Sequence, residues 1–292
     1  MKTNTKCLII CGLLSTASAF AQSPVSGFMS AKGKGSAVVS YSSEKYSEVF
    51  LVPEKVAGVP VFNEVQNTAV NLYATYGITD KLEMVLGLPH VKSQGKGDEA
   101  FLKANNFTTS RSGIQDLSFF LKYKISSTKV GSATLDIIAS AGVQTPVGNY
   151  KVDEGLQSII AIGNRATKVT PTAIAHYKTE SGLFVTGQLG YSFRNNRVPN
   201  ALVSELKAGY AANKVYVDAW VARQTSASGT DILQAGFDGF FPATRVNYTR
   251  VGANVFAPIA GGLGVVVGVN SYLEGRNLGK SSGFSAGLVL NY

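Results

Sequence analysis

Apolar and polar residues alternate along almost the whole chain, in segments of about ten residues that are separated by turn-forming sequences. Alternation with a period of two places successive side chains on opposite faces of a β-strand. A length of about 9–11 residues is what a tilted strand needs to cross a lipid bilayer. About twelve such segments are present, at roughly 34–43, 67–77, 81–91, 114–125, 132–144, 168–178, 183–194, 201–211, 214–223, 245–257, 263–272 and 283–292.

The connections between these segments alternate between short and long. The short ones hold the Gly, Asn, Asp and Pro of tight turns and cover 77–81, 126–131, 179–182, 211–214 and 257–262. The long ones cover 44–66, 92–113, 145–167, 195–200, 224–244 and 273–282. Bacterial outer-membrane barrels have this asymmetry, with short periplasmic turns and longer outer loops. An even number of strands leaves both chain ends on the short-turn side.

The two faces of each segment differ in polarity. In 114–125, Leu121 shares its face with four other apolar residues, whereas Lys122 shares the opposite face with Asp116, Ser118 and Phe120. A soluble β-sandwich also alternates, with its apolar face inward. The apolar faces here stay nearly free of charge over all the segments, as lipid requires. Charged residues make up only 15% of the chain, below the roughly 25% of soluble domains.

The pattern therefore predicts an all-β fold: a closed antiparallel transmembrane up-and-down β-barrel of about twelve strands. In lipid every backbone polar group must be paired, so the sheet has to close and the last segment must pair with the first. That last segment, 283–292, alternates as far as Tyr292, which we expect at the membrane interface. Such an aromatic strand end is read by the barrel-assembly machinery, which we expect as a partner together with outer-membrane lipid.

The beginning of the chain predicts export. Lys2 and Lys6 precede a short apolar run, and small residues ending at Ala21 follow it, as in a secretory signal peptide. The run is too short for a membrane anchor, which needs about 20 residues. We predict a signal peptide over 1–21, a barrel domain over 22–292, and a location in the outer membrane of a Gram-negative cell.

Several functional classes find no support in the residues. Both cysteines lie in the predicted signal peptide, so we expect no disulfide, thiolate metal site or other cofactor. The mature chain is basic, but it lacks the features of a nucleic-acid-binding protein. His90 and His176 are its two histidines, and no G-x-S-x-G or H-E-x-x-H motif is present. We therefore predict that the protein is not an enzyme.

The inward faces carry most of the ionisable residues and some aromatic ones. We predict that these residues line the lumen: Glu83, Asp116, Phe120, Lys122, Asp136, His176, Glu205, Lys207, Asp218, Trp220 and Arg250. Two interpretations stay open. The side chains contact a passing solute, or they form ion pairs and packing that fill a narrow barrel.

The first long connection is unusually apolar for a loop in water. Its apolar residues include Phe50, Leu51, Val52, Val59, Val61 and Phe62. Left exposed, they would form a patch of the kind that marks an interaction site. We predict that this loop packs over or into the mouth of the lumen as a gate, or else docks a partner.

Four stretches of the sequence carry a resemblance: "TYGITDKLEMVLGLPHV" (75–91), "SGIQDLSFFLKYKI" (112–125), "QTPVGNY" (144–150) and "EGRNLGKSSGFSAGLVLNY" (274–292). Together they resemble a known outer-membrane family, the one associated with the MetA pathway of phenol degradation. The last is similar to the closing hairpin of Bacteroidota-like members. The resemblance implies an outer-membrane barrel that takes up small hydrophobic or aromatic compounds; the alternative is a structural or partner-binding barrel without transport. Fatty-acid-uptake barrels carry a long N-terminal plug, and residues 22–33 are too few for one.

Overall fold

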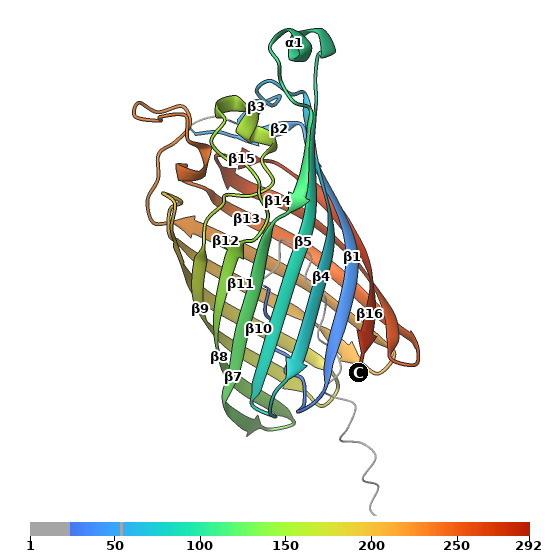
Figure 1. The fold of residues 1–292 in the computed structure, drawn as a ribbon. Helices are drawn as coiled ribbons and strands as arrows, with labels where there is room; N and C mark the ends of the chain where they lie inside the picture. Colours follow the sequence, from blue (N-terminus) through green and yellow to red (C-terminus); the bar gives the residue numbers. More distant parts are fainter. Residues whose placement is uncertain (1–23, 53–54) are drawn as a thin grey trace, which may run out of the picture.

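The protein folds as a closed antiparallel barrel (Figure 1), in a computed structural model that describes residues 24–52 and 55–292. The predicted signal peptide lies outside the described residues. The strands of the wall are β1 (Gly35–Tyr46), β4 (Glu64–Gly77), β5 (Leu82–Lys96), β7 (Asp116–Val130), β8 (Ala133–Pro146), β9 (Lys168–Thr179), β10 (Leu183–Arg194), β11 (Ala201–Ala212), β12 (Val215–Ser226), β13 (Asn247–Ala260), β14 (Leu263–Arg276) and β16 (Ser282–Asn291). These twelve strands confirm the predicted fold class.

The barrel closes where the sequence predicts it. Strand β16 pairs with β14 on one side and with β1 on the other, from Ser36 opposite Asn291 to Lys45 opposite Ser282. The remaining wall strands pair with their neighbours in chain order, and β4 completes the ring by pairing with both β1 and β5. Every wall strand thereby has a pairing partner on both sides, as a lipid environment demands.

The two ends of the barrel differ. Tight turns close one end, called the turn end, which lies at the bottom of Figure 1. Long connections gather at the other end, called the loop end, and carry the small elements β2 (Glu48–Phe50), β3 (Lys55–Ala57), α1 (Glu99–Ala104), β6 (Ser110–Ile114), η2 (Gly155–Ile160), η3 (Phe241–Ala243) and β15 (Leu278–Gly279). No helix among the described residues has the length and apolar character needed to cross a membrane.

Two parts of the wall depart from the predicted segments. Several strands, β5 among them, run on toward the loop end beyond the predicted limit, because pairing with a neighbour continues past the apolar band. The predicted segment 114–125 is interrupted at Gln115, between β6 and β7. Pro89 on the facing strand β5 has no N–H to donate, and its carbonyl accepts from the Gln115 N–H at 3.0 Å. The predicted loop 92–113 contains the end of β5, α1 and β6.

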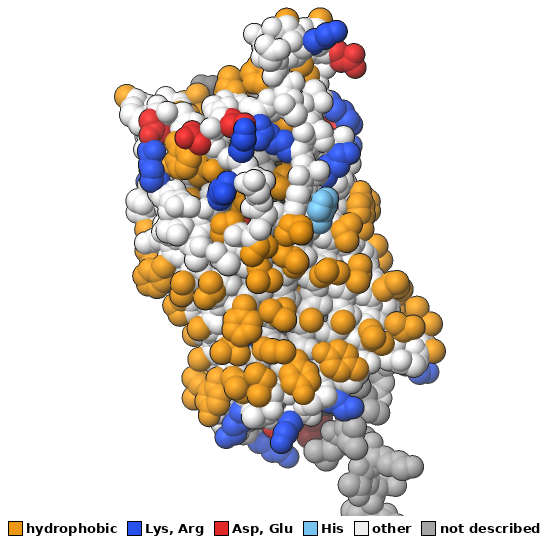
Figure 2. All heavy atoms as spheres, viewed as in Figure 1, with side chains coloured by type: hydrophobic (Ala, Val, Ile, Leu, Met, Phe, Trp, Pro, Cys, Tyr) orange, Lys and Arg blue, Asp and Glu red, His pale blue; other side chains and the backbone are white. Residues whose placement is uncertain are grey.

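The outward face of the wall is apolar. Figure 2 shows hydrophobic side chains covering the barrel wall between charged groups at the turn end and charged groups at the loop end. Leu206, Leu288 and Val267 are all more than half exposed. Their neighbours on the inward face are buried, Lys207 at 3% exposure. This inversion of the usual burial pattern is typical of a protein whose solvent is lipid.

An arginine on the outward face will oppose insertion. Leu121→Arg places a charge in the apolar band, at a cost of about 2–4 kcal/mol. Thr172→Arg on β9 places the same charge against the interior cavity described below, opposite the uncharged Ser140 and Gly190, and should fold nearly as well as the natural protein. Heat-modifiable gel mobility after refolding into lipid vesicles measures both yields. Equal yields for the two variants would contradict the assignment of faces.

Candidate functional site: the lumen and the segment that crosses it

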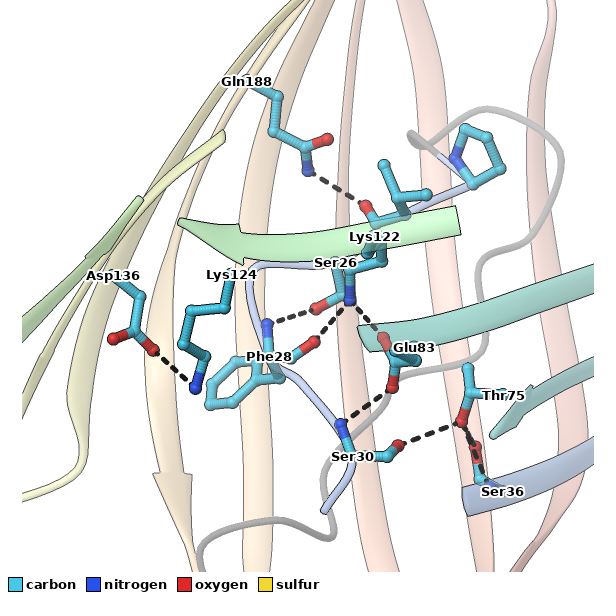
Figure 3. A network of polar contacts seen from close by, with 12 residues as sticks. Ser26, Phe28, Ser30, Ser36, Thr75, Glu83, Lys122, Lys124, Asp136 and Gln188 are labelled. Atoms are coloured by element: carbon cyan, nitrogen blue, oxygen red, sulfur yellow. Dashed lines mark hydrogen bonds and ion pairs between the residues drawn. The ribbon is translucent and has the colours of Figure 1, made fainter. Parts of the chain in front are cut away.

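The residues before the first strand lie inside the barrel. Residues 24–31, called the lumen segment, precede β1 and run through the interior, and Figure 3 shows part of this segment among side chains of the wall. Val25, Ser26 and Ser30 are at most 5% exposed. The sequence excluded only a long plug here and did not predict that these few residues would themselves lie in the lumen. A barrel of twelve strands is narrow, so a short segment without secondary structure suffices to obstruct it.

Side chains of the wall satisfy the backbone of the lumen segment. Buried peptide groups need hydrogen-bond partners, and this segment has no neighbouring strand to supply them. The Ser30 N–H donates to Glu83 Oε1 at 2.8 Å, and Lys122 Nζ donates to the Phe28 carbonyl at 2.6 Å. Closer to the loop end, Gln188 Nε2 donates to the Val25 carbonyl at 3.0 Å. Strands β5, β7 and β10 thus hold the segment from different sides of the lumen.

Glu83 and Lys122 form a buried ion pair at the centre of this network (Figure 3). They lie directly opposite each other on β5 and β7, and Lys122 Nζ is 2.5 Å from Glu83 Oε2. Neither side chain is more than 1% exposed. Burying such a pair carries a desolvation cost, which the mutual attraction and additional hydrogen bonds must offset. The peptide groups of Phe28 and Ser30 supply those additional bonds.

The apolar side chains of the lumen segment fill two separate pockets. Val25 packs into a buried cluster with Val85, Phe120, Ile138 and Ile174. Phe28 packs into another, where its ring lies 4.4 Å from His176 and 5.0 Å from Phe184, measured between centroids.

Gly27 lies between these two positions. A Cβ atom there would lie 2.5 Å from His176 Nδ1, so only glycine fits this approach to the wall. Together the segment and the two clusters fill the lumen toward the turn end.

A cavity of about 340 Å³, called the lumen cavity, lies on the other side of the lumen segment. Pro24 and Val25 of the segment contribute to its lining. The remaining lining is mostly polar and includes Asn71, Tyr73, Asp116, Phe120, Gln144, Lys168, Thr170, Thr172, Gln188, Ser192, Arg194, Glu205, Gln224 and Tyr248. Charges of both signs are present.

Sequence reasoning missed several members of this lining, above all Lys168, Arg194 and the lumen segment itself. Lys168 and Arg194 share the inward face of β9 and β10 with His176 and Phe184, so the alternation could have identified them. The lumen segment offered a weaker signal. Its apolar Val25 and Phe28 would be out of place in a tail exposed to water.

All the residues predicted to line the lumen lie inside the wall, and most of the charged ones pair with one another. Lys207 Nζ lies 3.6 Å from Glu205 Oε1 and 4.0 Å from Asp218 Oδ2. Lys124 lies 3.4 Å from Asp136. Of the predicted residues, Asp116, Phe120 and Glu205 line the lumen cavity.

Toward the loop end, Arg250 donates to Glu44 Oε1 at 2.5 Å and to Asn270 Oδ1 at 2.6 Å. Trp220 is buried on β12, 6% exposed. His176 Nδ1 lies 2.7 Å from Thr186 Oγ1. Most of the residues predicted to line the lumen thus form ion pairs, hydrogen bonds and packing that fill a narrow barrel. Their contact with a solute stays a prediction.

The predicted gating loop packs against other loops at the loop end. Val59 and Phe62 are buried in an apolar cluster with Val49, Leu102 of α1 and Ile160 of η2, and Leu51 and Val61 pack against this cluster. Val52 is half-buried, and Phe50 on β2 pairs with β15. Residues 53 and 54 lie outside the described residues. That the loop gates the lumen stays a prediction.

Ion pairs fix the long connections in place. Asp231 accepts two hydrogen bonds from the Arg276 guanidinium, at 2.7 and 2.5 Å. The hydrogen bonds from Arg276 hold the pKa of the Asp231 carboxyl below its usual range. Glu154 in the connection after β8 pairs with Arg111 of β6, and this contact likewise lowers the pKa of Glu154. Both carboxylates therefore stay ionised over the neutral range, and the loops keep their arrangement there.

Comparisons with known proteins agree with the barrel. The COG4313 outer membrane channel from Pseudomonas putida F1 is similar in structure, with a TM-score of 0.69 and 16% identity, over 89% of this chain and 96% of that chain. The translocator domain of the autotransporter NalP from Neisseria meningitidis has a TM-score of 0.48 and 11% identity, over 89% and 90% of the two chains. At these identities the first likeness shows the fold, and the second is too distant to support an argument.

Sequence comparison places the chain in a family. No curated protein sequence matches it. Residues 54–288, most of the chain, match the family described as "Putative MetA-pathway of phenol degradation". The resemblance inferred from the four sequence stretches is thereby confirmed. The chain belongs to this MetA-pathway phenol-degradation family and has the fold of an outer-membrane β-barrel.

Proposed function

We propose that the protein is a channel for the passive entry of a small uncharged aromatic solute, and that the lumen segment closes it. The observation that carries this proposal is the lumen cavity of about 340 Å³, which the chain's own residues 24–31 separate from the turn end. A barrel that served only as a scaffold would need neither the cavity nor a segment threaded beneath it. The phenol-degradation description of the family supports the choice of solute.

The difference between the loop end and the turn end indicates how the barrel is oriented in the membrane. Long loops face outward and short turns face the periplasm in bacterial barrels of this kind. With that orientation the lumen cavity faces the outside and the lumen segment blocks the periplasmic half. Export by the signal peptide at 1–21 and insertion by the barrel-assembly machinery would bring the chain to the outer membrane.

The lining of the lumen cavity suits a solute that is uncharged but able to form hydrogen bonds. Lys168 Nζ lies 3.5 Å from Asp116 Oδ2, and Arg194 and Glu205 line the same space, so charges of both signs are present. Amide and hydroxyl groups offer both donors and acceptors, and Tyr248 adds an aromatic surface. A ring carrying one polar substituent, such as a phenol, satisfies both requirements.

Opening requires movement of the lumen segment. It is attached to the wall by hydrogen bonds from side chains, whereas each wall strand pairs with neighbours along most of its length. Such a segment can leave without breaking the ladder of the barrel. Its release would join the lumen cavity to the periplasmic end and produce a continuous path.

A barrel without transport is the second candidate, and the paired charges of the lumen favour it. A catalytic role is not part of the proposal. His176 is buried against Thr186, and His90 lies on β5 with its side chain exposed. Solute flux through the natural protein, and its reversible loss when the lumen segment is locked in place, separates the two candidates, because a structural barrel carries no solute while this segment is in place.

The buried ion pair can be tested by removing one charge or both. Glu83→Gln leaves the Lys122 ammonium buried without its carboxylate, which should destabilise the protein by about 3–5 kcal/mol. The double variant Glu83→Gln/Lys122→Met removes both charges and should recover part of this loss, because the Phe28 carbonyl still lacks its donor. Urea unfolding in lipid, followed by fluorescence of the single tryptophan, Trp220, measures the free energy of unfolding. A double variant as unstable as the single one would show that the unpaired charge is not the cause.

The lumen segment can be locked to the wall by a disulfide. Ser30 Oγ and Thr75 Oγ1 are 3.4 Å apart, and the chain has no cysteine after residue 11. We expect Ser30→Cys/Thr75→Cys to suppress ion conductance and p-cresol uptake when oxidised and to regain natural levels under reductant. Deletion of 24–31 should raise conductance severalfold.

The single variant Ser30→Cys, treated in the same way, controls for the redox treatment. Natural flux through the oxidised double variant would contradict closure by this segment. Absence of conductance from a folded deletion variant would favour the barrel without transport.

A further inference from the structure

A second cavity, called the outer cleft, lies among the long connections at the loop end. Its volume is about 290 Å³. Its walls come from the first loop with the end of β1, the connection after β8, the connection after β12, and β15. The apolar members of the lining are Tyr46, Val49, Leu51, Val59, Pro60, Val152, Leu156, Ile159, Ile232, Leu233, Phe241, Pro242, Val246 and Leu278.

The outer cleft differs from the lumen cavity in its chemistry. No charged side chain lines it in the part of the chain that the structure describes. Three of its polar side chains, Ser158, Thr244 and Asn277, have partners within the protein: Ser158 Oγ donates to the Val152 carbonyl at 2.9 Å, and Thr244 Oγ1 donates to the Phe241 carbonyl at 2.8 Å. Asn277 Nδ2 donates to Asp231 and to the Arg245 carbonyl. A ligand with charge would find no counter-ion here, whereas an apolar one would lose no hydrogen bond.

The walls of the outer cleft are held in place without a ligand. Asp231 receives the paired hydrogen bonds of Arg276, a geometry that fixes both partners. Gly279 lies against the Tyr46 ring, where a Cβ would be 2.5 Å from Cδ2. Preformed cavities with apolar walls are the usual form of small-molecule sites.

Two leucines on this lining are exposed to water. Leu156 is 47% exposed and Leu233 is 59% exposed, although both belong to loops outside the apolar band. Apolar surface kept in contact with water at one place marks an interaction site rather than a folding core. A ligand that enters the cleft and covers these two side chains would gain binding free energy from the burial of their apolar surface.

The outer cleft adjoins the lumen. Gln224 lines the lumen cavity, and its Nε2 donates at 2.9 Å to the carbonyl of Val246, which lines the outer cleft. The linings of the two cavities are therefore in direct contact at this hydrogen bond. A molecule bound in the cleft lies beside the entrance to the lumen.

We propose that the outer cleft is a binding site for a small uncharged aromatic molecule of one or two rings, from which the molecule passes to the lumen. The volume is near the lower limit of small-molecule sites, which run from about 300 to 1,000 Å³. The role in uptake rests on the proposed function, but binding in the cleft does not.

Photolabelling with benzophenone tests the binding site directly. The full-length protein, expressed and purified from the outer membrane, is irradiated with benzophenone in detergent and the modified peptides are identified by mass spectrometry. We expect labelling of peptides that line the cleft, around 152–161 and 232–246, and competition by excess p-cresol. Leu156→Asp/Leu233→Asp should reduce this labelling about fivefold or more, because two charges at the opening oppose an apolar ligand. Phe101→Asp, on α1 and outside the cleft lining, is the matched control and should label like the natural protein.

Each labelling result either supports or overturns the proposed binding site. Labelling confined to the lipid-facing strands, or equal labelling of cleft peptides in Leu156→Asp/Leu233→Asp and the natural protein, overturns the site. Cleft labelling with competition supports it even if p-cresol uptake is absent, and that result would remove the transport proposal alone. Uptake without cleft labelling would remove this inference alone.

Discussion

Lipid offers a peptide group no hydrogen bond, and the rest of this structure follows from that constraint. It requires closure of the sheet, so β16 pairs with β1 from Ser36 to Lys45. It requires an apolar outward face, so Leu288 and Leu206 are exposed where a soluble protein would bury them. The inward positions of the same strands must then take every polar and charged group of the wall.

The same constraint acts a second time inside the barrel. The lumen segment is buried but has no neighbouring strand, so its peptide groups need partners from side chains. Glu83, Lys122 and Gln188 provide them. A charged pair that would be costly in an apolar interior is stabilised here because the segment's backbone completes its hydrogen bonds. The pair and the segment therefore depend on each other, since loss of either leaves buried polar groups unsatisfied.

The wall could be predicted from the sequence because each strand position is decided locally. Leu121 and Lys122 face opposite ways as a result of the strand period alone, and the partner of Lys122 follows from the adjacent strand. The lumen segment could not be predicted in this way. Its location depends on contacts with residues far away in the sequence, such as Gln188, and it has no period that would reveal them. The clefts between loops depend on distant contacts in the same way.

The two cavities differ in chemistry, and the proposed route of a solute passes both of them. A solute leaving water for the apolar outer cleft gains from burial of its ring, and the lumen cavity then offers hydrogen bonds that the cleft lacks. In this proposal the cleft offers mainly apolar contacts and the lumen cavity mainly hydrogen bonds, so we expect moderate binding of a phenol at each. Moderate binding at successive sites favours passage, because a site that bound the whole molecule tightly would retain it. A passive channel for an amphipathic solute therefore benefits from separating its apolar and polar contacts in space, as the outer cleft and the lumen cavity do here.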